Sequence, residues 1–128
     1  YLTPPGKTTG HWLVVYSGGA WAGNSYALGY ADCGDTITGD DRGPGEPRCK
    51  KITTTGPWLD TDASKDLYGP GTPTFYTNEA GDTMMSIQAW QYSRGKANKK
   101  NNGQIMRTYK ITADDGFDPK VNLKRVDL

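Results

Sequence analysis

Short runs of β-branched and aromatic residues, each closed by glycine or proline, are the feature that most restricts how this chain folds. The clearest run covers residues 11–17 (His-Trp-Leu-Val-Val-Tyr-Ser), and Gly18 and Gly19 end it. The chain has 17 glycines and 8 prolines among its 128 residues, a share well above average usage. Turns at this frequency leave no room for long helices. The sequence therefore predicts an all-β fold built from short antiparallel strands.

The expected strands fall into two sets of four. The first set comprises residues 1–3, 11–17, 25–33 and 49–54, and the second comprises residues 73–77, 83–90, 104–112 and 121–126. We predict two four-stranded antiparallel meander sheets, one within residues 1–56 and one within residues 57–128, which together form a fragment of one domain. Repeated four-stranded sheets are the unit of a β-propeller. A single eight-stranded sandwich or barrel has the same strand count, so the strand pattern alone leaves both architectures open.

Charge, hydropathy and cysteine usage narrow the class of protein. Fifteen basic and 14 acidic residues give a net charge of +1, which argues against a dedicated nucleic-acid binder. No apolar run approaches the roughly 20 residues needed to cross a bilayer, so no membrane partner is predicted. Cys33 and Cys49 flank a stretch rich in glycine, proline and aspartate. An even cysteine count with a loop between the two predicts one disulfide in a secreted, extracellular protein.

Segments along nearly the whole chain resemble glycoside hydrolase family 43, and they follow one another in the order that the family has. Residues 11–19, Trp21 and residues 25–31 resemble the fourth blade of that family. Four later segments resemble the fifth blade: Gly69-Pro70-Gly71, Thr74-Phe75, residues 86–90 and residues 106–111. Members are five-bladed β-propellers that hydrolyse arabinose- or xylose-containing polysaccharides. The resemblance implies that this chain corresponds to the two C-terminal blades.

The resemblance also implies that the catalytic carboxylates lie outside the chain. In the family, the base and a second aspartate come from earlier blades, and the acid glutamate precedes a Tyr-Leu pair like Tyr1-Leu2. The chain is thus expected to begin just after the acid and to contain no catalytic residue. Its own close pairs are interpreted as solvated turn residues: Asp40 with Asp41, Asp60 with Asp62, and Asp114 with Asp115.

Four residues are predicted to bind substrate. Trp21 and Asn24 lie in a glycine-rich loop that suits stacking on a sugar ring, although the tryptophan can equally pack under its own loop. Arg107 shares one strand face with Ile105 and Tyr109, and an inward arginine must be paired or functional. The resemblance places at this position an arginine that reaches the sugar in the central pocket; the alternative is an outward, solvated side chain. Gln88 is the fourth residue.

Two departures from the family concern its central metal. Thr72 follows Gly69-Pro70-Gly71 where the family often has a histidine, and Gln88 replaces a second histidine. We therefore predict no cofactor and no metal site, including the central calcium of some relatives. His11 is the only histidine of the chain.

The functional hypothesis is that the chain is the C-terminal part of a secreted glycoside hydrolase that resembles family 43. It would bind and hydrolyse plant cell-wall polysaccharide or oligosaccharide only with an N-terminal partner chain or through self-association. Whether the chain is itself an enzyme stays open. The alternative is a non-catalytic secreted carbohydrate-binding or effector protein, and a small structural or inhibitory protein is a third hypothesis.

Overall fold

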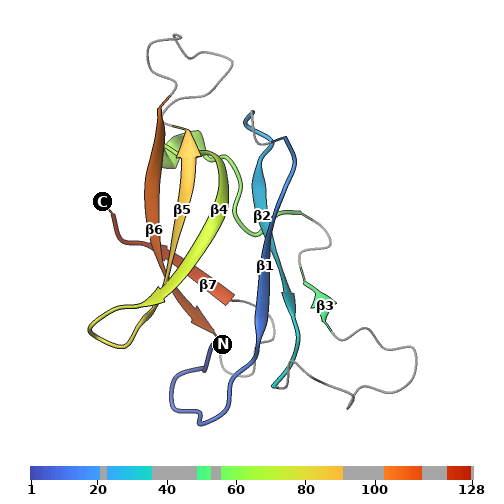
Figure 1. Ribbon diagram of the computed structural model, residues 1–128, viewed down its shortest axis with the longest axis vertical. Helices are drawn as coiled ribbons and strands as arrows, with labels where there is room; N and C mark the ends of the chain where they lie inside the picture. Colours follow the sequence, from blue (N-terminus) through green and yellow to red (C-terminus); the bar gives the residue numbers. More distant parts are fainter. Residues whose placement is uncertain (21–22, 36–48, 53–55, 91–102, 114–120, 128) are drawn as a thin grey trace.

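The computed structural model describes residues 1–20, 23–35, 49–52, 56–90, 103–113 and 121–127, and these residues form two antiparallel sheets. The first sheet contains β1 (Leu13–Gly18), β2 (Ala27–Asp32) and β3 (Lys50–Lys51) in that order. The second contains β4 (Tyr68–Thr77), β5 (Thr83–Trp90), β6 (Gln104–Ala113) and β7 (Val121–Arg125), also in chain order (Figure 1). One short 3-10 helix, η1 (Ala63–Lys65), precedes β4. The predicted all-β fold of two meander sheets is confirmed.

The first sheet is smaller than the sequence predicts. The expected strand over residues 1–3 contributes only an isolated bridge, in which Leu2 and His11 exchange two backbone hydrogen bonds of 2.9 Å. Pro4 and Pro5 follow at once, and proline lacks the N–H that a longer ladder requires. Of the strand expected over residues 49–54, β3 covers Lys50 and Lys51, and residues 53 and 54 lie outside the described residues. Among the described residues this sheet therefore has three strands instead of four.

The second sheet follows the prediction closely except at its start. β5 has the predicted bounds, and β6 and β7 each differ by one residue. β4 begins at Tyr68, five residues before the expected start at Pro73. Register shifts on either side of Gly71 allow the Gly-Pro-Gly segment to enter the strand, as β-bulges do. The Gly-Pro-Gly segment, which lies outside the strand expected over residues 73–77, is thus part of the sheet.

The hydrophobic core lies between the two sheets. β1 lies beside β4 (Figure 1), and Leu28 and Tyr30 of β2 are buried with side chains of the second sheet. These are Met85, Ile87, Ala89, Tyr109 and Ile111. Burial of apolar surface is the main stabilising contribution to such a two-sheet arrangement. The division of the chain at residues 56 and 57 stays a prediction.

The predicted disulfide between Cys33 and Cys49 is present. It joins the residue after β2 to the residue before β3. Beside it, His11 Nδ1 lies 2.9 Å from both carboxylate oxygens of Asp32. In the part of the chain that the structure describes, no helix is long and apolar enough to cross a membrane.

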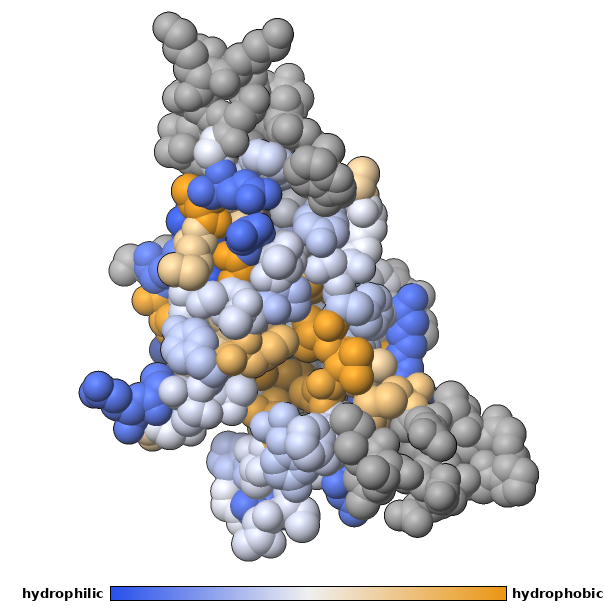
Figure 2. All heavy atoms as spheres, viewed as in Figure 1, coloured by the Kyte–Doolittle hydropathy of each residue, from blue (hydrophilic) through white to orange (hydrophobic). Residues whose placement is uncertain are grey.

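Both sheets keep exposed apolar side chains on the faces that point away from the core. Val14 on β1 is 45% exposed, and Met106 on β6 is 67% exposed. In the space-filling view, hydrophobic residues form an orange area near the centre of the visible face (Figure 2).

Candidate functional site

A small hollow opens where the loop between β1 and β2 meets the start of β4. Its volume is about 280 Å³, and we call it the junction pocket. Its lining residues are Tyr26, Gly69, Thr72, Gln88, Trp90 and Gln104. The β1–β2 loop and the last residues of β5 reach the same end of the molecule (Figure 1). Segments far apart in the sequence therefore form one site.

The Gly-Pro-Gly segment of β4 makes this close approach possible. A Cβ on Gly69 would lie 2.5 Å from the carbonyl oxygen of Gly23, and the φ of Gly69 is +54°. A Cβ on Gly71 would lie 2.0 Å from a ring carbon of Tyr26. Only glycine fits at a position that combines a positive φ with such a close backbone contact.

Asn24 lies beside the pocket and is tied to β4 through one threonine. The hydroxyl of Thr61 donates to the backbone oxygen of Asn24 at 2.7 Å, and the N–H of Gly69 donates to the same hydroxyl oxygen at 2.9 Å. These bonds hold the β1–β2 loop against the start of β4.

Thr72 carries the backbone strain of the site. Its φ is +52°, which is a genuine outlier for a β-branched residue. Its N–H donates to the hydroxyl of Ser17 on β1 at 3.1 Å. Strained backbone of this kind clusters at ligand sites, because the surrounding structure must hold it in place.

The polar groups of the junction pocket are neutral. In the described lining they are the hydroxyls of Tyr26 and Thr72, the amides of Gln88 and Gln104, and the indole N–H of Trp90. Calcium prefers several carboxylate and carbonyl oxygens, and the described lining of the pocket includes no carboxylate and no histidine. Throughout the described ranges, no group of three or more His, Cys, Asp or Glu side chains gathers. The donor set therefore does not fit a central calcium and suits hydrogen bonds to hydroxyl groups.

Arg107 lies apart from this pocket. Its Nη2 is 2.9 Å from a carboxylate oxygen of Asp66, and its Nη1 is 3.5 Å from one of Asp127. Arg107 pairs with Ile87 across the sheet and shares the inner face with Tyr109, so the predicted alternation is confirmed. The side chain is 14% exposed. The inward arginine is thus paired with carboxylates.

The predicted binding residues are therefore only partly brought together. Gln88 lines the junction pocket, Asn24 lies next to it, and Arg107 is held elsewhere by ion pairs. Trp21 lies outside the described residues. Gln104 joins the site without having been predicted; the signal was its position opposite Trp90 in an antiparallel pair, since directly opposed residues share a sheet face.

No protein-family model matches the chain, and no curated protein matches its sequence. Two solved structures are similar to it. One is an endo-1,4-β-xylanase from Bacteroides thetaiotaomicron VPI-5482, at 21% identity and a TM-score of 0.63 over 92% of this chain. The other is a thermostable family-43 glycoside hydrolase, at 20% identity and a TM-score of 0.65 over 92% of this chain.

The chain has the fold of part of a family-43 glycoside hydrolase. It spans 35% of the xylanase chain and 33% of the family-43 chain. The two sheets are therefore blade-like units of a β-propeller, which decides between the propeller and the sandwich or barrel that the strand pattern left open. At these identities the likeness establishes the fold alone.

Of the three close carboxylate pairs, the structure describes one, Asp60 with Asp62. Asp62 is the N-cap of η1, where its side chain accepts a hydrogen bond from the N–H of Ser64. Hydrogen bonds from Ser64 and Lys65 lower the pKa of Asp62 below its ordinary value. Asp60 is exposed. The other two predicted pairs, Asp40 with Asp41 and Asp114 with Asp115, lie outside the described residues.

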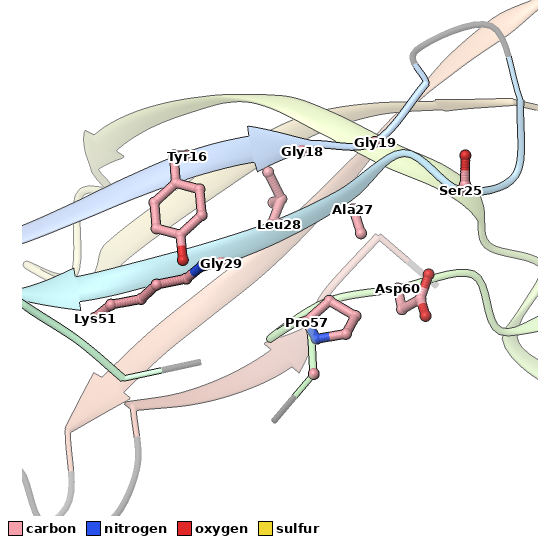
Figure 3. A pocket seen from close by; sticks show the side chains of 11 residues that line it. Tyr16, Gly18, Gly19, Ser25, Ala27, Leu28, Gly29, Lys51, Pro57 and Asp60 are labelled. Carbon is pink, nitrogen blue, oxygen red and sulfur yellow. The ribbon is translucent and has the colours of Figure 1, made fainter. Parts of the chain in front are cut away.

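A second, more open hollow lies on the outer face of the first sheet (Figure 3). Its volume is about 410 Å³, and its floor includes Gly18 and Gly29. The ammonium group of Lys51 lies 5.6 Å from the ring centre of Tyr16, within cation–π range. Asp60 lines the same hollow. It opens on the sheet face opposite the core.

We expect stability to fall in acid through the carboxylate of Asp127. Burial alone would raise the pKa of Asp127, but hydrogen bonds from Arg125 and from the N–H of Thr108 outweigh burial and lower it. A carboxylate with a depressed folded-state pKa stabilises the fold above its unfolded pKa, about 3.9. That stability is lost as the pH falls through the folded-state value. Urea unfolding of the native chain and Asp127→Asn between pH 7 and pH 2 measures the effect.

The Asp127→Asn variant should be less stable than the native chain at pH 7, and the difference should shrink below about pH 4. Asp35→Asn is the matched control, because Asp35 is exposed. A constant difference across the whole pH range would contradict the assignment to Asp127.

Proposed function

We propose that the chain is the C-terminal part of a secreted glycoside hydrolase of the family-43 type. The observation that carries the proposal is the propeller fold that it shares, over 92% of its length, with one third of two such enzymes. The substrates would be arabinose- or xylose-containing polysaccharides of the plant cell wall. The Cys33–Cys49 disulfide supports an extracellular location.

In this proposal, the chain contributes substrate binding and a missing N-terminal part contributes the chemistry. Glycoside hydrolysis requires two carboxyl groups on either side of the scissile bond, and the residues described in the lining of the junction pocket supply none. The N-terminal part, either a partner chain or a preceding segment, would also cover exposed apolar residues such as Val14 and Met106. Self-association is the other way to cover these faces.

The test combines the mass of the native species with a hydrolysis assay. We expect the 128-residue chain alone to release no pentose from arabinan or xylan. The same chain, purified from its source with every associated polypeptide, should release arabinose or xylose. Hydrolysis by the lone chain would contradict the proposed division of labour, and an inactive complex with all five blades would contradict the activity itself.

A second candidate function is sugar binding without catalysis. It is favoured by the junction pocket, whose described lining comes entirely from this chain and is neutral. The fold would then serve as a carbohydrate-binding or effector protein. The lone chain would bind oligosaccharide and never require a partner.

Both candidate functions predict that Gln88→Ala weakens oligosaccharide binding by about 2- to 12-fold, the loss expected for one neutral hydrogen bond. Stability should change little, because Gln88 is exposed. Isothermal titration with xylohexaose and arabinohexaose measures the change. Glu79→Ala, at the distant tip of the β4–β5 hairpin, is the control. Equal affinities for Gln88→Ala and the native chain would remove Gln88 from the site.

A further inference from the structure

A third hollow lies at the outer edge of the second sheet, away from the junction pocket. It has a volume of about 930 Å³ and lies between β7 and the segment from Pro57 to Leu67. We call it the β7 groove. Trp58, Leu59, Leu67 and Leu123 supply apolar lining, and Tyr109 lines the groove from β6. None of these residues lines the junction pocket.

Tyr109 carries an unused hydrogen-bonding group in this groove. The residue is 5% exposed, and no described residue donates to or accepts from its hydroxyl. Burial raises the pKa of Tyr109, with smaller effects from Arg125 and Asp127, so the phenol stays neutral and keeps its O–H. Among the described residues, only Arg107 Nε is a buried side-chain polar atom without a partner, so the Tyr109 hydroxyl is reachable from the groove and is available to a ligand there.

Both ends of the groove are bridged. At one end the indole N–H of Trp58 donates to the carbonyl oxygen of Val121 at 3.0 Å. At the other end Arg125 donates to the carbonyl oxygen of Lys65. Four steps along β7 at about 3.4 Å each give a length of about 14 Å between these bridges. An extended peptide pairing along β7 would have to break one bridge, so the groove suits a short ligand.

The charges of the groove balance. Lys65 lies 3.2 Å from Asp62, and Arg125 lies 3.0 Å from Asp127. Asp127 does not line the groove but neutralises Arg125. The two remaining charged residues of the lining, Asp60 and Lys124, have opposite signs. The groove therefore offers no net attraction for an anion or a cation, and a neutral ligand fits it.

We propose that the β7 groove binds a short neutral oligosaccharide at a second site. The indole of Trp58 provides an apolar surface for a sugar ring, and the Tyr109 hydroxyl and the Asp60 carboxylate provide partners for sugar hydroxyls. The proposal shares its ligand class with the proposed function but uses different residues. The groove can thus hold a glycan whether or not the junction pocket takes part in hydrolysis.

The test is the substitution Tyr109→Phe, which removes the hydroxyl and keeps the ring. Titration of the isotope-labelled 128-residue chain with xylohexaose and arabinohexaose should shift the amide signals of Ser64, Leu123 and Lys124. Tyr109→Phe should weaken this binding by about 2- to 12-fold, the loss of one neutral hydrogen bond. Without ligand, the melting temperature of Tyr109→Phe should stay close to that of the native chain, because the ring is kept and the hydroxyl that is removed has no partner within the described residues.

Two variants separate this site from the junction pocket. Gln88→Ala should leave the shifts of Ser64 and Leu123 unchanged, and Tyr76→Phe, on the outer face of the second sheet, should change neither site. Shifts confined to the junction pocket would overturn the proposal while leaving the proposed function intact. Shifts at Leu123 with an unstructured peptide, and with neither hexaose, would assign the groove to a protein partner and also overturn it.

Discussion

Gly69→Ala should cost the chain about 2–5 kcal/mol of stability and should disrupt the junction pocket. The left-handed backbone conformation costs a residue with a Cβ about 1–2 kcal/mol. The new Cβ would also lie 2.5 Å from the carbonyl oxygen of Gly23, and backbone cannot rotate away as a side chain can. Moving the loop would break the bond from the Gly69 N–H to Thr61, and a buried group without a partner costs about 1–3 kcal/mol.

Gly18→Ala is the control for this prediction. A Cβ on Gly18 would meet no atom within 4 Å, so its free energy of unfolding should change by less than about 1 kcal/mol. Urea unfolding measures both variants. A total stability of about 5–15 kcal/mol is usual, so Gly69→Ala would remove a large part of it. Equal unfolding midpoints for the two variants would show that the β1–β2 loop moves freely away from β4.

The strands were predictable from the sequence because their signals are local. Runs of β-branched and aromatic residues between glycines place β1, β5, β6 and β7 within one or two residues of their observed bounds. The prediction of a strand over residues 1–3 was wrong, because Pro4 and Pro5 follow and only the bridge between Leu2 and His11 forms. β4 was predicted too short because Gly-Pro-Gly is usually a turn, whereas here the opposing Tyr26 ring and the Gly23 carbonyl require its glycines.

The site was less predictable because its contacts join distant residues. Gln88 was identified through the resemblance, but Gln104 enters only by its pairing with Trp90 across the sheet. The alternation in β6 gave the correct face for Arg107. It could not give the partners, because Asp66 and Asp127 lie 41 and 20 positions away in the sequence. A role for Arg107 in sugar binding stays a prediction.

Arg107→Met should destabilise the chain by about 2–4 kcal/mol, because breaking a buried ion pair leaves a carboxylate without its partner. Asp127 contributes most of this loss, since its side chain is 19% exposed, whereas Asp66 is 61% exposed and is readily solvated. The remaining bond between Arg125 and Asp127 limits the loss. Urea unfolding at pH 7 measures it, and the loss should shrink below about pH 4 as Asp127 takes up a proton.

Arg107→Lys decides between a structural role and a role in ligand binding. Lysine keeps the charge but lacks the planar guanidinium that pairs with two carboxylates at once. The stability of Arg107→Lys should therefore fall between the stability of the native chain and that of Arg107→Met. If the ion pairs are the whole role of Arg107, both variants should bind xylohexaose as the native chain does at a temperature where all three are folded. Weaker binding by both variants without any loss of stability would instead place Arg107 at the sugar. The structure favours the first result, because the guanidinium already contacts two carboxylates and lies apart from the junction pocket.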